Sequence, residues 1–149
     1  MKPLAANARR RGIAAVELAL ALPVLLVMLT FPLYLGRVFW HYTVIERAAQ
    51  DAARYLSTIP LSEMRNPTLA PGVTAVANNI VAAEIAELAP GTYSPWVTVT
   101  CDNGICSGIN APAAVRVNIQ VQMEDIFFSG VTELTVPLTA DVVYPYLGR

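Results

Sequence analysis

A stretch of 23 residues near the amino terminus, Ile13–Leu35, is apolar except for one ionisable residue, Glu17. A helix rising about 1.5 Å per residue spans roughly 34 Å over this length, more than the hydrocarbon core of a bilayer at about 30 Å. The chain is 55% hydrophobic and 14% charged, whereas a soluble domain usually carries about 25% charged residues. We therefore predict one membrane-spanning helix, and the composition argues against an ordinary cytosolic enzyme.

The charges flanking this stretch predict its orientation. Four of the ten Lys and Arg residues precede it, namely Lys2, Arg9, Arg10 and Arg11. Because basic residues stay on the cytoplasmic side, the amino terminus is predicted to be cytoplasmic and the rest of the chain periplasmic. Beyond residue 12 the chain contains six Lys and Arg and eleven Asp and Glu. This acidic balance does not predict a basic surface that would bind nucleic acid.

A secretory signal is the competing interpretation of the same stretch. Ala19-Leu20-Ala21 has the form of a signal peptidase site, which would make Leu22 the first mature residue. Only six residues of the stretch, Ile13–Leu18, precede this motif and the chain stays apolar for fourteen more after it, so a spanning helix fits better. Pro23 and Pro32 each remove a helical hydrogen bond, and we expect them to bend or loosen the helix.

Glu17 admits two interpretations. An ionised carboxylate deep in a membrane helix costs about 2.5–3.5 kcal/mol, but near the helix start it lies close to the interface and to the positive end of the helix dipole. Alternatively, cleavage after Gly12 would leave a cationic amine on Ile13, one turn from Glu17. The carboxylate could then pair with the amine of an adjacent subunit, which is nearly obligatory once both charges are buried.

Two groups of residues resemble a known family. Arg10–Glu17, followed by a Leu/Ala/Val run with Pro23, resembles the processing and membrane segment of type IV pilin-like proteins. The Leu35-Gly36-Arg37 sequence and the Ala-rich Ile45–Tyr55 segment resemble the TadE-like minor pilins, or pseudopilins, of the tight-adherence pilus system. The resemblance covers about residues 9–57.

The resemblance implies a role and a set of partners. A prepilin peptidase of the inner membrane would cut between Gly12 and Ile13, after which the chain would take part in assembly, initiation or capping of a pilus. Its partners would be the lipid bilayer, other pilin and minor-pilin subunits and the inner-membrane assembly platform. Glu17 would serve subunit docking, and Arg9, Arg10 and Arg11 would be the topology signal. The resemblance implies no catalysis.

A different class of function fits the same topology: an uncleaved single-pass anchor that presents a periplasmic adaptor or binding domain. The two hypotheses differ on cleavage after Gly12 and on the effect of Glu17→Ala. The chain contains one His and two Cys, which are too few to form a His/Cys metal site. We expect no cofactor and no enzymatic activity. We expect His41 to be an interfacial polar residue beside Trp40 and Tyr42, in an aromatic belt.

Beyond the membrane the helix is predicted to continue as a stalk. One helical face is formed by residues three and four apart: Val38, Tyr42, Ile45, Ala49, Ala52 and Leu56. Pro60 ends the helix by Ser57 or Thr58. The predicted domains are therefore a basic cytoplasmic leader at 1–12, a transmembrane and stalk helix at 13–57, and an outer periplasmic domain at 58–149.

The outer domain is predicted to be α+β. Residues 58–72 read as a loop, and Val73–Leu88 as a short helix buried through Val73, Val76, Ile80 and Leu88. Alternating residues then predict an antiparallel sheet of three to four strands, with strands at Trp96–Cys101, Val115–Met123 and Leu134–Ala140. The stalk and short helix would cover one face of this sheet.

The two cysteines are predicted to form a structural disulfide. Asn103-Gly104 is a preferred type I′ hairpin pair, which would place Cys101 opposite Cys106 with Cα atoms about 4.5 Å apart. Such a distance is at the short end of the disulfide range, and the periplasm permits oxidation.

Overall fold

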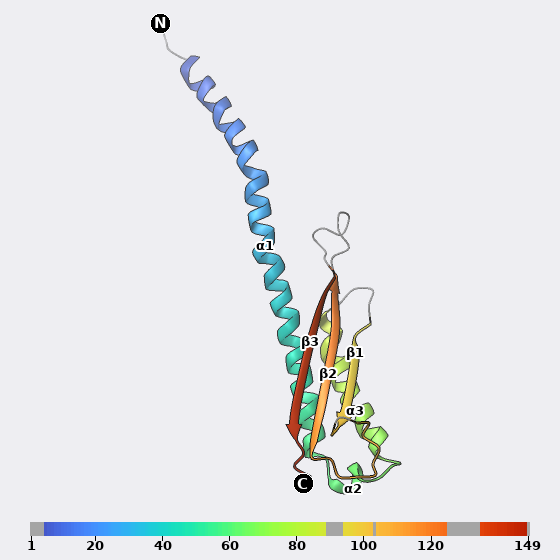
Figure 1. The fold of residues 1–149 in the computed structure, drawn as a ribbon. Helices are drawn as coiled ribbons and strands as arrows, with labels where there is room; N and C mark the ends of the chain where they lie inside the picture. Colours follow the sequence, from blue (N-terminus) through green and yellow to red (C-terminus); the bar gives the residue numbers. More distant parts are fainter. Residues whose placement is uncertain (1–4, 89–93, 103, 125–134, 149) are drawn as a thin grey trace. The chain divides into compact units, whose positions relative to one another are not determined.

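The computed structural model describes residues 5–88, 94–102, 104–124 and 135–148, with side chains from residue 14 onward (Figure 1). Its elements follow in the order α1 (Ala5–Thr58), α2 (Leu61–Met64), α3 (Ala70–Ile85), the 3-10 turn η1 (Ala86–Leu88), β1 (Trp96–Cys101), β2 (Ala114–Glu124) and β3 (Thr135–Pro145). This order confirms the α+β class. The chain divides into two compact units, Met1–Arg37 and Val38–Arg149, which are described separately.

The first unit is the amino-terminal part of α1. The helix begins at Ala5, eight residues before the predicted start, and continues through Pro23 and Pro32 without a break. Each proline lacks the N–H that would bond the carbonyl four residues earlier. Between them Thr30 Oγ1 donates to the carbonyl of Leu26 at 2.8 Å. The Thr30 hydroxyl is thus bonded back onto the backbone of its own helix.

The second unit contains an antiparallel sheet in the order β1-β2-β3. Val117 of β2 lies between Val99 of β1 and Val142 of β3, which fixes the register across all three strands. The three strands of the described residues agree with the predicted sheet of three to four antiparallel strands. β3 runs five residues beyond its predicted end at Ala140, and its predicted first residue, Leu134, lies outside the described residues.

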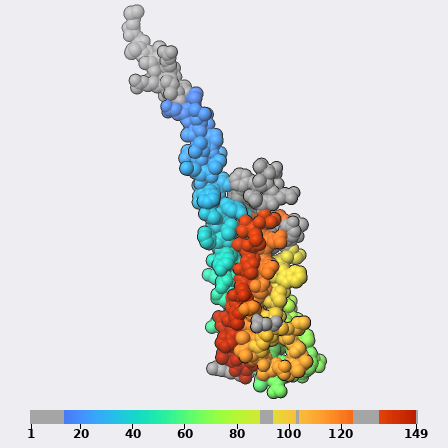
Figure 2. Space-filling view, in the orientation of Figure 1, coloured from blue at the N-terminus to red at the C-terminus, as the bar shows by residue number. Residues whose placement is uncertain are grey.

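The core lies on one face of this sheet, under the stalk part of α1 and under α3, while the other face is turned outward (Figures 1 and 2). Side chains alternate along β2, and every second residue is almost fully buried: Val115, Val117, Ile119, Val121 and Met123. The stalk supplies mainly small residues with no exposed surface, namely Ile45, Ala48, Ala49, Ala52, Ala53 and Leu56. Alanines allow the backbones to approach closely, so aliphatic side chains of the sheet fill the space between.

The buried helix faces agree with the predicted ones only in part, since Ile45, Ala49, Ala52, Leu56, Val73 and Leu88 are buried as predicted. On the stalk, Tyr42 is 44% exposed and Val38 is half-buried, and His41 takes the inward position instead. On α3, Val76 is exposed and Ile80 half-buried, while the buried face is formed by Ala70, Val73, Ala77, Val81 and Ile85. For α3 the prediction ranked large apolar residues above alanine, although Ala70 and Ala77 take buried positions there.

The connection after α1 is more ordered than predicted. Residues 58–72 were expected to form a loop, but they contain α2 and the first turn of α3, where Pro71 occupies the start of the helix. Proline is favoured there because the N–H it lacks has no helical acceptor. The carboxyl-terminal tail returns to this region: Leu147 N donates to Ser57 O at 3.0 Å, and the Tyr146 hydroxyl donates to Ile59 O at 2.7 Å.

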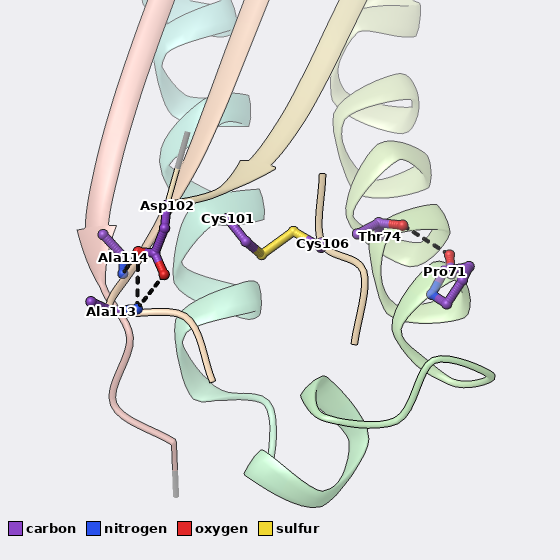
Figure 3. The surroundings of a disulfide bond; sticks show 7 residues. All are labelled: Pro71, Thr74, Cys101, Asp102, Cys106, Ala113 and Ala114. Carbon is purple, nitrogen blue, oxygen red and sulfur yellow. Dashed lines mark hydrogen bonds between the residues drawn. A yellow bond between two sulfur atoms is a disulfide. The ribbon is translucent and has the colours of Figure 1, made fainter. Parts of the chain in front are cut away.

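The disulfide joins Cys101 and Cys106, whose Cα atoms are 5.0 Å apart (Figure 3). The predicted hairpin register is wrong, because Cys101 exchanges both backbone hydrogen bonds with Gly104 at 2.8 and 2.9 Å. Asp102 has a φ of 50°, and its carboxylate accepts the backbone N–H groups of Ala113 and Ala114 at 2.9–3.0 Å. These bonds favour the left-handed conformation at Asp102, which aspartate tolerates. Asn103 lies outside the described residues.

Gly108 anchors the following loop to the segment between α2 and α3. Its φ is +73°, and an added Cβ would lie 2.6 Å from the backbone carbon of Asn66 and the nitrogen of Pro67. Both the backbone conformation and the available space therefore require glycine.

We predict that Gly108→Ala destabilises the protein by about 2 kcal/mol or more, because a left-handed alanine costs roughly 1–2 kcal/mol and the clash is with rigid backbone. The measurement is the Tm of the full chain in detergent. Gly72→Ala in α3 is the matched control, since its Cβ meets nothing within 4 Å and alanine favours a helix by up to about 1 kcal/mol. Equal Tm values for Gly108→Ala and wild type would contradict this account.

Candidate assembly interface

The membrane segment of α1 exposes apolar side chains all around the helix. The exposed apolar residues lie on every side of the helix, which has no polar face. They include Val16, Leu20, Val27, Phe31 and Leu33. A helix that is apolar on every side belongs in a bilayer or among other helices. Within the part of the chain that the structure describes, this is the one helix long and apolar enough to cross a membrane.

The predicted processing and docking residues lie at the start of this surface. The backbone of Arg9, Arg10, Arg11, Gly12 and Ile13 is helical, and the side chains of these residues lie outside the described part. Glu17 is exposed on α1, four residues after Ile13. Residues four apart lie on the same helical face, so the Glu17 carboxylate lies on the face that starts at Ile13.

Three exposed aromatic residues follow the apolar segment, in the second compact unit: Phe39, Trp40 and Tyr42. Aromatic side chains of this kind favour the membrane–water interface. His41 was predicted to belong with them, and that prediction is wrong. Its ring is only 4% exposed, and Nε2 lies 3.0 Å from the carbonyl of Leu88. Because a carbonyl accepts, Nε2 donates, and the ring fastens α1 to η1.

Two carboxyl groups, Asp51 on α1 and Glu84 on α3, lie next to each other. Burial of Glu84 on α3 raises its pKa from the usual 4.5, and the adjacent Asp51 on α1 raises it further by its charge and by a hydrogen bond. No sequence spacing signals this pair, because the two residues are on different helices and 33 positions apart. When both groups are ionised, they repel each other across the helix–helix contact.

The outward face of the sheet is polar. Arg116 Nε lies 3.5 Å from Asp141 Oδ1, and both side chains are partly exposed, so the pair contributes little to stability. Trp96 is 70% exposed at the beginning of β1, and its indole N–H donates to Thr98 Oγ1 at 2.8 Å. Polar residues thus form most of the face opposite the core, with Trp96 and Val143 as exposed apolar exceptions.

These features define a chain with one candidate membrane helix whose stalk carries an α+β unit. Residues 12–54 match the family model described as TadE-like protein, which confirms the resemblance inferred from the residues. The match covers the membrane segment and most of the stalk, less than a third of the 149 residues. No curated protein and no solved structure matches the chain.

The carboxyl pair predicts a pH dependence of stability. Since the pKa of Glu84 is raised in the folded state, the folded chain binds more protons than the unfolded chain as the pH rises above about 4.5. Its stability therefore falls through that window. Glu84→Gln should raise the Tm of the full chain at pH 7.5, with a smaller effect at pH 4.

Glu87→Gln is the control, because it neutralises an exposed carboxylate on η1. The difference in Tm between variant and wild type is compared at both pH values in detergent. A Glu84→Gln variant that is no more stable than wild type at pH 7.5 would rule out repulsion across this contact.

Proposed function

We propose that the chain is a minor pilin, or pseudopilin, of the tight-adherence pilus. It inserts in the inner membrane with Arg9, Arg10 and Arg11 in the cytoplasm and its carboxyl-terminal unit in the periplasm. Prepilin peptidase cuts between Gly12 and Ile13, and the mature chain then takes part in assembly, initiation or capping of the pilus. The chain performs no catalysis of its own.

The observation that carries this proposal is the TadE-like match over residues 12–54. It begins at Gly12, the residue before the proposed cut, and extends through the exposed apolar surface of α1 into the buried stalk. A segment with that surface can be covered by lipid before assembly and by other subunits afterwards, because both environments exclude water.

Glu17 gives the proposed docking step its specificity. In an assembled bundle the free amine of Ile13 on a neighbouring subunit would compensate the Glu17 carboxylate. Removing one partner of a buried ion pair leaves an uncompensated charge, which costs about 3–5 kcal/mol. The amine exists only after cleavage, so this pairing would admit processed subunits and reject unprocessed ones.

We predict that protein from native membranes begins at Ile13. Intact mass and terminal sequencing would show a loss of residues 1–12. A Gly12→Val variant should keep the uncut terminus, because a branched side chain replaces the residue at the cut. A wild-type chain that retains Met1 would instead support a membrane-anchored adaptor, and one that begins at Leu22 would support a secreted protein.

We predict that Glu17→Ala leaves membrane insertion intact and lowers the amount of the chain in sheared pili by at least about ten-fold, from the cost of an unpaired buried charge. Quantitative immunoblots of membrane and pilus fractions provide the measurement. Glu46→Ala is the matched control, since it removes a carboxylate from the same helix beyond the membrane segment, where Glu46 contacts only Gln50 in the described hydrogen bonds. Normal incorporation of Glu17→Ala would refute the docking role.

A further inference from the structure

The outward face of the sheet carries polar side chains in rows that cross all three strands (Figure 2). Side chains directly opposite one another on adjacent strands have Cβ atoms about 4.5–5.5 Å apart, so each row is a continuous strip of surface. The register gives three such rows: Trp96, Gln120 and Thr139; Thr98, Asn118 and Asp141; Thr100, Arg116 and Val143. The two apolar members, Trp96 and Val143, are at opposite corners of this surface.

Two hollows open on this face. The first has a volume of about 220 Å³, and its lining includes Ser94, Trp96, Gln120, Gln122 and Thr139. The second has a volume of about 240 Å³ and is lined by Thr98, Thr100, Arg116, Asn118 and Asp141. Because the linings draw on successive rows, the two hollows follow one another along the strands. An elongated ligand that lies along the strands can occupy both.

Trp96 is the largest exposed side chain of this face. It is 70% exposed, although tryptophan is highly buried on average in folded proteins. Its indole N–H donates to Thr98 Oγ1 at 2.8 Å, which orients the ring. The face of an aromatic ring carries negative charge density, so it attracts the slightly positive C–H groups of a ligand. Trp96 is therefore suited to stacking against a ring whose faces are lined by C–H groups.

The polar side chains between the strands are oriented by contacts with one another. Gln120 Nε2 donates to Asn118 Oδ1 at 3.4 Å, and Arg116 Nε lies 3.5 Å from Asp141 Oδ1. Amide and hydroxyl groups can both donate and accept hydrogen bonds, so this face matches a ligand that does the same. Side chains that are oriented in advance lose less conformational entropy on binding.

The charge of the face selects among classes of ligand. Arg116 and Asp141 are the only charged residues that line the two hollows, and they neutralise each other. A nucleic acid or another polyanion requires uncompensated Lys and Arg. A protein partner usually meets an apolar core enriched in aromatic residues, whereas Trp96 is the one aromatic residue in these linings. Charge complementarity therefore favours an uncharged ligand that is rich in hydroxyl and amide groups and has apolar ring faces, which describes a polysaccharide.

We propose that the outward face of the sheet binds the glycan strands of the cell wall, which are chains of N-acetylated sugars. One sugar ring stacks on Trp96, and the acetamido and hydroxyl groups of the chain bond to the amides of Gln120 and Asn118. The choice of the cell wall rests on the proposed function, which places this unit in the periplasm. A few copies bound in this way would hold the unit at the wall during pilus assembly, so the inference suits a minor component.

Tryptophan fluorescence of the full chain tests the contact directly. The chain is held in an amphipol without sugar groups, because a glycoside detergent would compete for the face. The chain has two tryptophans, so Trp40→Phe leaves Trp96 as the only fluorophore. Chitohexaose, an uncharged chain of N-acetylated sugars, should shift this emission saturably. Trp96→Phe, in which only Trp40 emits, is the control and should show no shift. Emission from Trp96 that does not respond to chitohexaose would overturn the proposal.

Co-sedimentation with protein-free cell-wall sacculi tests the source of the glycan. Trp96→Ala and Gln120→Ala should each lower the affinity at least about five-fold, as expected for central contact residues, while Trp96→Phe keeps most of it. Val143→Ala, on the same face outside both hollows, and Asn78→Ala, an exposed amide on α3, are the matched controls.

Three results would contradict the assignment. Wild-type affinity in both Trp96→Ala and Gln120→Ala would exclude this face as the site. Binding to chitohexaose but not to sacculi would exclude the cell wall. Equal affinity for cellohexaose, which lacks acetamido groups, would exclude selection of N-acetylated sugars. The Tm of each variant shows that it is folded, and Trp96 and Gln120 are both exposed, so their removal should leave the core intact.

The outcome is separable from that of the proposed function. Cleavage after Gly12 and incorporation into pili are measured independently of glycan binding. A chain that is cleaved and incorporated but binds neither chitohexaose nor sacculi would overturn this inference alone. A chain that binds both but retains Met1 and is absent from pili would overturn the proposed function alone.

Discussion

The apolar surface of α1 is the constraint on which the rest of the structure depends. Between Ala14 and Leu35 large aliphatic side chains are exposed all around the helix, and each one costs about 1.5–3 kcal/mol if it is left in water. Nothing within the first compact unit covers them in the described residues. The helix therefore requires a bilayer or other helices around it. In the proposed function, the helices of other subunits replace the lipid when the pilus is assembled.

The same helix changes character beyond Val38, where its buried surface becomes a single face rich in alanine. Ala48, Ala49, Ala52 and Ala53 contribute little apolar area, but they are fully buried because the sheet supplies the larger side chains. The stalk part of α1 thus forms one side of the core of the second unit.

Much of this architecture was predictable from the periodicity of apolar residues and from the positions of proline. Pro60 located the end of α1 but the apolar run missed its first eight residues, and alternation located β1 and β2 to within one residue. The inward position of His41 was not predictable, because it depends on a carbonyl at Leu88 that is 47 residues away. The register at Cys101 was missed because the Asp102 carboxylate binds backbone groups eleven and twelve residues later. The Asp51–Glu84 pair likewise arises only where distant segments meet.

The stalk is tied to the rest of its unit near both of its ends, by His41 to Leu88 at one and by Ser57 and Ile59 to the carboxyl-terminal tail at the other. This arrangement has a mechanical consequence. A force along the axis of α1 is resisted by all the contacts between helix and sheet at once, in shear, and the unit cannot be peeled open one contact at a time. The second unit is therefore suited to being pulled by the stalk.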